Sequence, residues 1–239
     1  MHMKYLFLFI FLYSSRLVSA VDYSTDTIEV ESKILNETRK ILVFKPVGLR
    51  DTDSVSIVYL LDGEYSKYRY DKIVEAQLVK SLVGIGILNT NRNRDMLPAK
   101  QADNFLKFIE EELIPVAESD LLCNHRVLYG HSFGACFTIY TMINKPKLFE
   151  KYLASSPTPI MDMVETSIYQ TLDNQLKKEL KFYFSYGSKD MRQVRKWSEI
   201  LYNNIKDTKF IHLTWKHEVY QGENHNSCDV ISLIKGLKY

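Results

Sequence analysis

Hydrophobic and polar positions along the chain follow two periods, one typical of strands and one typical of helices. Short apolar or β-branched runs predict strands at 27–34, 40–44, 55–61, 83–88, 126–129, 151–154, 180–186 and 212–220. Longer runs predict helices at 102–117, 135–143 and 191–205, with a further helix after the last strand. Repeated alternation of strands and helices is typical of an α/β fold with a mostly parallel sheet covered by helices on both faces.

Two segments refine this picture. Strands 27–34 and 40–44 flank a turn at Asn36-Glu37, which predicts an antiparallel pair at the start of the sheet. Helix 102–117 carries Phe105, Phe108, Ile109 and Leu113 on one face, while the charged run at 110–112 is expected to be mostly solvated. The apolar stripe therefore predicts core packing rather than a cofactor site.

The N-terminus has the pattern of a secretory signal. Lys4 precedes an apolar run at 5–13, and the small residues before Ala20 suggest cleavage after that position. The interpretation gives a signal peptide at 1–20 and one domain at 21–239, because no linker or repeat interrupts the rest. An exported protein, periplasmic or secreted, without a stable membrane span after cleavage is expected. A retained anchor is the alternative, although the apolar run is short for a bilayer.

Composition narrows the function classes. The chain has 239 residues, 46% of them hydrophobic, and a net charge of +2 with both signs interspersed, which argues against nucleic acid as a partner. Cys123, Cys136 and Cys228 show no metal-site spacing, so no metal site is expected. Cys136 is expected in the core, and any disulfide pairing stays open.

A G-x-S-x-G pattern at 130–134 lies between the predicted strand 126–129 and the predicted helix 135–143. This context fits a nucleophile elbow, in which a sharp turn lifts the Ser132 hydroxyl clear of the sheet. Gly130 and Gly134 are expected because a Cβ at either position would collide with the tight turn. The alternative is an ordinary loop in which Ser132 caps the helix.

A serine nucleophile needs a base and an orienting acid. His225 lies in a polar loop after the last predicted strand, and Asp190 follows the strand before it, which is the order Ser, acid, His. The alternatives are that Asp190 caps the helix 191–205 and that Glu223 is the acid. The amide of Phe133 is the first expected oxyanion donor, and Glu64 or Gly63 is expected to supply the second.

Several segments in this order resemble a family of esterases that includes enterochelin esterases, esterase D and mycolyltransferases. The segments that carry the resemblance are 58–63 (VYLLDG), 89–98 (NTNRNRDMLP), 130–134 (GHSFG), 155–157 (SSP) and 222–225 (GENH), after an opening at 32–39. The similarity covers nearly the whole predicted mature chain.

The resemblance implies an α/β-hydrolase fold with a minimal cap, and hydrolysis of carboxylic esters by Ser132, Asp190 and His225 without a metal or organic cofactor. Arg92 is a candidate contact for a substrate anion, while Arg94 and Asp95 are expected to pin a loop near the cleft. Asp62 and Tyr65 are further candidate substrate contacts.

The tyrosines at 65, 68 and 70 and the segment 158–178 are expected to influence specificity. The expected partner is a small-molecule or glycan-linked ester, and siderophore lactones, feruloyl or acetyl sugar esters and simple acyl esters all stay open. Two other functions stay open as well. One is an acyltransferase that uses the same triad, and the other is a catalytically inactive binding protein.

Overall fold

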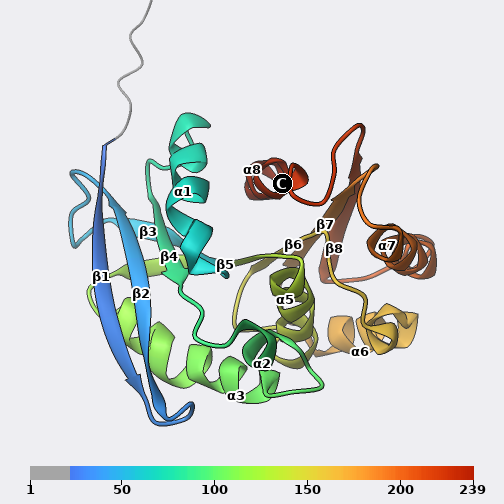
Figure 1. Cartoon of the computed structure of the whole chain (residues 1–239), viewed down its shortest axis with the longest axis horizontal. Helices are drawn as coiled ribbons and strands as arrows, with labels where there is room; N and C mark the ends of the chain where they lie inside the picture. Colours follow the sequence, from blue (N-terminus) through green and yellow to red (C-terminus); the bar gives the residue numbers. More distant parts are fainter. Residues whose placement is uncertain (1–21) are drawn as a thin grey trace, which may run out of the picture.

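The computed structural model describes residues 22–239, so the predicted signal peptide lies outside the described residues. Eight strands form one sheet in the order β1-β2-β4-β3-β5-β6-β7-β8 (Figure 1). Their bounds are β1 Tyr23–Ser32, β2 Glu37–Pro46, β3 Ser54–Leu60, β4 Leu82–Ile87, β5 Leu122–His131, β6 Lys151–Ser155, β7 Leu180–Gly187 and β8 Leu213–Tyr220. All eight predicted strands are present, with ends displaced by at most four residues.

The sheet is antiparallel only at its first edge. Strand β1 pairs with β2, and β2 pairs with β4, in antiparallel register. All other neighbours, from β4 through β3 to β8, pair in parallel. The carboxyl ends of six strands therefore meet at one edge of the sheet, which is where sites form in such folds.

Helices cover both faces of the sheet. Their bounds are α1 Ser66–Glu75, α2 Arg92–Met96, α3 Ala102–Lys107, α4 Ile114–Ala117, α5 Phe133–Asn144, α6 Thr166–Gln175, α7 Arg192–Ile205 and α8 Cys228–Lys238. Figure 1 shows α1 and α8 on one face and α3, α5, α6 and α7 on the other. Each face buries its own apolar cluster, around Tyr70 and Leu233 on the first and around Phe105, Phe137 and Trp197 on the second.

The predicted helix 102–117 is continuous, but its middle, Phe108–Leu113, is wound as a π-helix between α3 and α4. Its four stripe residues are fully buried, as predicted. The acidic run differs from expectation at Glu112, whose carboxylate accepts bonds from the Ser32 hydroxyl and the amides of Lys33 and Ile34. Glu112 thereby ties the turn between β1 and β2 to the helix.

Three helices, α1, α2 and α6, were not predicted. Segment 158–178 packs partly into the core, because Tyr169 and Leu172 of α6 are buried while Gln170 and Thr171 between them are exposed. Tyr70 is likewise buried, stacked on Phe44 at 4.9 Å, so it is a core residue and not a contact for substrate.

Within residues 22–239, no helix has both the length and the apolar character needed to cross a membrane.

Candidate active site

Ser132 occupies the turn between β5 and α5. Its φ of 59° and ψ of −116° lie outside the regions that residues with a side chain favour, which is the strained geometry of a nucleophile elbow. A Cβ on Gly130 would lie 2.2 Å from the backbone of Gly134, so Gly130 has to be glycine. A Cβ on Gly134 would approach Leu61 and Asp62 only to 3.4 Å. The predicted collision therefore occurs at Gly130, and Gly134 is merely closely packed.

Backbone bonds hold the elbow against the end of β6. The Ser132 amide donates to the carbonyl of Ser155 at 2.9 Å, and the amide of Thr158 donates to the carbonyl of Ser132 at 3.2 Å. The Ser132 hydroxyl is half-buried and lies 3.5 Å from the hydroxyl of Thr158. Over residues 22–239 it forms no hydrogen bond with His225, and such contacts often tighten only when substrate binds.

The structure brings the predicted acid and base together. His225, in the loop between β8 and α8, places Nδ1 2.8 Å from Oδ1 of Asp190, which follows β7. The Asp190 side chain is fully buried and that of His225 is 21% exposed. Helix α7 begins at Arg192 with Met191 as its N-cap, so Asp190 is not the cap residue. The alternative acid, Glu223, contributes its backbone carbonyl, which accepts a 2.8 Å bond from the amide of residue 189.

Two further donors surround the Asp190 carboxylate. The Ser156 hydroxyl donates to Oδ2 at 2.5 Å, and the Met191 amide donates to Oδ1 at 2.6 Å. Burial alone would raise the pKa of Asp190, but the bonds from His225 and Ser156 outweigh burial and keep the pKa below its usual value. Asp190 is therefore ionised at neutral pH and able to orient an imidazole.

His131, the variable residue of the elbow motif, packs against His225 with ring centroids 4.7 Å apart. Its Nδ1 lies 3.1 Å from the Ser155 hydroxyl. Burial is the largest of the effects that lower the pKa of His131 to about 4, so its imidazole is neutral at pH 7. Neither this contact nor the role of Ser156 could be predicted from residue spacing, although the Ser-Ser-Pro segment at 155–157 lies at this place.

The expected oxyanion donors lie at the first turns of two helices. A 3-10 turn spans Gly63–Tyr65, and its first helical bond runs from the Tyr65 amide to the carbonyl of Asp62. The amides of Gly63 and Glu64 precede this bond and have no helical acceptor, and the same is true of Phe133 at the start of α5. Free first-turn amides are suitable donors for a developing anion.

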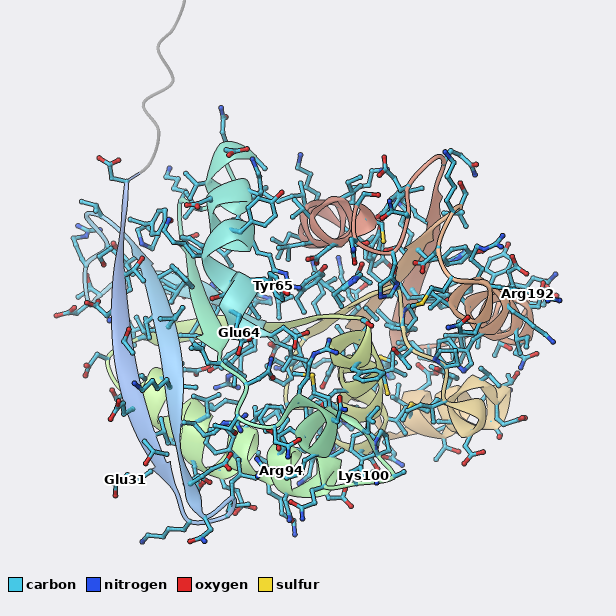
Figure 2. The ribbon with its side chains drawn as sticks, viewed as in Figure 1. Glu31, Glu64, Tyr65, Arg94, Lys100 and Arg192 are labelled. Carbon is cyan, nitrogen blue, oxygen red and sulfur yellow. The ribbon has the colours of Figure 1, made fainter. Side chains whose placement is uncertain are left out.

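Asp62 and Arg92, two of the candidate substrate contacts, form a forked ion pair. Nε of Arg92 donates to Oδ1 of Asp62, and a terminal nitrogen donates to Oδ2 at 2.8 Å. The Asp62 side chain is only 4% exposed, whereas that of Arg92 is 33% exposed. Tyr65, the third candidate, is the last residue of the 3-10 turn and has an exposed side chain, which Figure 2 shows beside Glu64.

A second buried ion pair lies beneath the site. Arg69 of α1 pairs with Asp229 of α8 at 3.0 Å and donates to the carbonyl of Leu61 at 2.7 Å. Tyr129 of β5 donates to the Asp229 backbone carbonyl at 2.7 Å. Together these contacts join the strand before the 3-10 turn, the strand before Ser132 and the helix after His225.

Over residues 22–239, no cluster of three or more histidine, cysteine or acidic residues is arranged to hold a metal ion.

Comparisons with known proteins identify the family and the fold. The family model described as "Putative esterase" matches residues 32–226. The chain is 26% identical over 168 residues to the ferri-bacillibactin esterase BesA of Bacillus subtilis, a match that covers 56% of this chain and 58% of the length of that relative. It is 38% identical over 61 residues, 24% of this chain and 20% of the relative, to a siderophore enterobactin esterase of Emericella nidulans.

Among solved structures, the BES protein from Bacillus cereus superposes with a TM-score of 0.80 at 22% identity. The match covers 100% of this chain and 98% of the chain of that protein. An IroE-like serine hydrolase from Shewanella oneidensis gives a TM-score of 0.77 at 24% identity. The match covers 91% of this chain and 79% of the chain of that hydrolase. These likenesses show that the fold is the α/β-hydrolase fold. Because the family model spans most of the chain, the protein belongs to this esterase family.

Proposed function

We propose that this protein is a serine esterase that hydrolyses carboxylic esters through an acyl-serine intermediate. One observation carries the proposal: a buried, ionised Asp190 bonds His225 at 2.8 Å at the sheet edge that also presents Ser132 on a strained elbow. Three residues from three separate loops with these chemistries form the arrangement that activates a hydroxyl. Membership of the esterase family supports the same assignment.

The hydrogen bond that His225 donates to Asp190 sets the roles of the two imidazole nitrogens. When Nδ1 of His225 donates its hydrogen to Asp190, Nε2 carries the lone pair and accepts the Ser132 proton. The Ser132 oxygen then forms a bond to the ester carbonyl carbon, and the carbonyl π electrons move onto oxygen. The amides of Phe133 and of Gly63 or Glu64 would stabilise this oxyanion.

The imidazolium of His225 next gives its proton to the departing alcohol as the ester C–O bond breaks, leaving an acyl group on Ser132. Water repeats the sequence with His225 as the base, and the acid product and free Ser132 result. The site favours water as the acceptor because Ser132 and His225 are both partly exposed to solvent.

The substrate class that fits the relatives is a siderophore ester. Relatives described as a ferri-bacillibactin esterase and an enterobactin esterase support this choice, whereas glycan-linked esters have no comparable support. Incubation with a catecholate trilactone and, separately, with feruloylated or acetylated oligosaccharides would separate the two classes by chromatography of the released acids. Faster release from the sugar esters would overturn the siderophore assignment.

The activity itself is tested with 4-nitrophenyl esters from acetate to octanoate. Wild-type protein should turn over at least the short esters, and Ser132→Ala should abolish turnover while leaving the fold intact by circular dichroism. Turnover that survives in Ser132→Ala would contradict the proposal. An inert wild-type protein that also fails to react with a fluorophosphonate would favour the alternative of a binding protein.

Export is part of the same proposal, and it rests on the N-terminal sequence pattern alone. N-terminal sequencing of protein recovered from the periplasm or medium of an expressing cell should begin at Val21. Full-length protein retained in the cytoplasm would contradict it.

A further inference from the structure

The segment that follows β4, residues 89–95, contains six charged or amide side chains that the triad does not use. At its start, the Asn89 side-chain amide donates to Asp62 Oδ1 and to Glu64 Oε2, both at 2.9 Å, and the Asn89 backbone amide donates to Glu64 Oε1 at 2.8 Å. The turn at 62–65 carries the expected oxyanion donors Gly63 and Glu64. It is thus held to Asn89 through the side chains of Asp62 and Glu64.

Asp62 itself adopts an unfavourable backbone conformation. Its φ of 55° is in the left-handed region, where a residue with a Cβ persists only if its surroundings hold it. Burial would raise the pKa of Asp62, but the bonds from Arg92 and Asn89 and the nearby charge of Arg69 keep the pKa below its usual value. The carboxylate is therefore a buried anion whose main partner is Arg92.

Arg92 also touches the elbow. The nitrogen that bonds Asp62 Oδ2 lies 3.3 Å from the carbonyl oxygen of His131, the residue before the nucleophile. The guanidinium carbon lies 5.0 Å from the ring centroid of Phe133, the residue after it. One guanidinium therefore joins the turn at 62–65 to both sides of Ser132.

The other end of the segment is anchored to the sheet. Arg94 forms a fork with the Glu37 carboxylate of β2 at 2.7 and 2.9 Å, and Arg39 of β2 bonds Asp95 at 2.8 Å with both side chains fully buried. Figure 2 shows Arg94, a residue of α2, near α3 and away from α1. Arg92 is thus attached to a fixed base rather than to a free loop.

We propose that the Asp62–Arg92 ion pair is a positioning clamp, which fixes the turn at 62–65 relative to the elbow so that the amides of both converge on one carbonyl oxygen. The inference deepens the proposed esterase function, on which its catalytic consequence rests. In this role Arg92 acts through the oxyanion donors and does not bind substrate.

The geometry favours a clamp over a substrate contact. If Arg92 turned toward a substrate anion, Asp62 would lose its fork and remain as a buried charge with Asn89 as its closest remaining donor, which is strongly unfavourable. The planar fork needs a guanidinium, because an ammonium group is a point charge and cannot form two parallel bonds. A lysine at position 92 would therefore keep the charge and lose the geometry.

The test compares Arg92→Lys and Asp62→Asn with Arg50→Lys. Arg50 forms a similar fork with Asp53, with a 2.7 Å bond, but its side chain is 78% exposed in the connection between β2 and β3. For each protein, kcat and KM are measured with neutral 4-nitrophenyl acetate and with the anionic 4-nitrophenyl ester of succinic acid. Amide hydrogen exchange of peptides covering 61–66 is measured on the same samples.

We expect Arg92→Lys and Asp62→Asn to lower kcat by about 10- to 100-fold for both esters, because misplaced oxyanion donors lose that much. KM should change by less than about threefold, since the ground-state contacts remain. Exchange in 61–66 should be at least about tenfold faster in both variants, and Arg50→Lys should match wild type in every measurement.

The opposite pattern would overturn the clamp: wild-type kcat and wild-type exchange in 61–66, with a KM increase confined to the anionic ester, would make Arg92 a substrate contact. The exchange measurement also separates the two proposals. If the wild-type protein hydrolyses neither ester, the esterase function fails, and exchange in 61–66 still decides the clamp. Faster exchange in Arg92→Lys supports the clamp, and unchanged exchange rejects it.

Discussion

Ser156 donates a 2.5 Å hydrogen bond to the Asp190 carboxylate from a backbone whose own φ is 50°. Both side chains are buried, and the hydroxyl is the one side-chain donor to Oδ2 within residues 22–239. The Ser156 hydroxyl also lies 2.9 Å from the sulfur of Cys228. Cys228 is the first residue of α8 and follows the loop that contains His225. A strained, buried residue that holds the acid indicates a positioning role.

Removing that hydroxyl should loosen the acid without abolishing catalysis. Ser156→Ala is expected to lower kcat about tenfold with little change in KM, because one bond to the charged form of Asp190 is lost. The loss of that bond should also raise the Asp190 pKa and move the acidic limb of the pH–rate profile to higher pH.

Ser156→Gly is the matched variant, because glycine adopts the left-handed conformation without strain. It should lose as much activity as Ser156→Ala while keeping or raising the midpoint of thermal unfolding. If Ser156→Gly instead restores wild-type kcat, the backbone conformation and not the hydroxyl supports the acid.

The choice between the two candidate acids is tested by a pair of amide substitutions. Asp190→Asn should lower kcat by about 10²–10⁴-fold, because an amide cannot stabilise the imidazolium of His225 and can reverse its tautomer. Glu223→Gln should leave kcat within about twofold, since the backbone amide and carbonyl of Glu223 form hydrogen bonds but its side chain forms none over residues 22–239. Equal losses in the two variants would reject the assignment to Asp190.

Acid stability should depend on Glu37. Hydrogen bonds from Arg94 are the largest of the effects that lower the pKa of Glu37 to about 2 from an ordinary value of 4.5. The ionised Glu37 carboxylate therefore stabilises the folded state. This stabilisation is complete above pH 4.5 and is lost as the pH falls toward 2. Urea unfolding of wild type and Glu37→Gln across this range should show a steeper decline in the wild-type free energy of unfolding. Parallel curves would contradict the expectation.

His217 should add a second pH dependence of stability at higher pH. It arises from an imidazole that burial keeps neutral, not from an ionised carboxylate. Burial against Phe184 lowers the His217 pKa to about 4 from an ordinary 6.5, so the unfolded chain binds a proton in that interval that the folded protein does not. Stability therefore falls as the pH drops from 6.5 toward 4. Thermal unfolding of His217→Asn should show a smaller decline over this interval than wild type, and an NMR titration of wild type should place the midpoint near 4.

The sequence predicted the central strands well because β3, β4 and β7 carry the nearly continuous apolar runs that a parallel, doubly covered sheet requires, whereas the edge strands β1 and β8 mix apolar and polar residues. It missed α1 for a physical reason. The buried residues of α1 are Ser66, Arg69, Tyr70 and Ile73, which follow helical spacing, but two of the four are polar. Arg69 is buried through its ion pair with Asp229, and a pattern of apolar residues cannot register such a partner 160 positions away.

The sequence indicated where the proposed triad residues lie, but not the partner of Arg92. Ser132, Asp190 and His225 each follow a predicted strand, so strand order alone places them at one edge of the sheet. The pairing of Asp62 with Arg92 depends on β4 lying beside β3 and on side-chain directions in two loops. The sequence left Arg92 only as a candidate contact for a substrate anion.

The central claim is that Ser132 is the nucleophile, and the most direct measurement is covalent labelling with a fluorophosphonate followed by peptide mass spectrometry. The structure predicts a single modified peptide with the label on Ser132, and labelling at least about 10²-fold slower in Asp190→Asn than in wild type. A folded wild-type protein that stays unlabelled, or that carries the label on another residue, would contradict the assignment of Ser132.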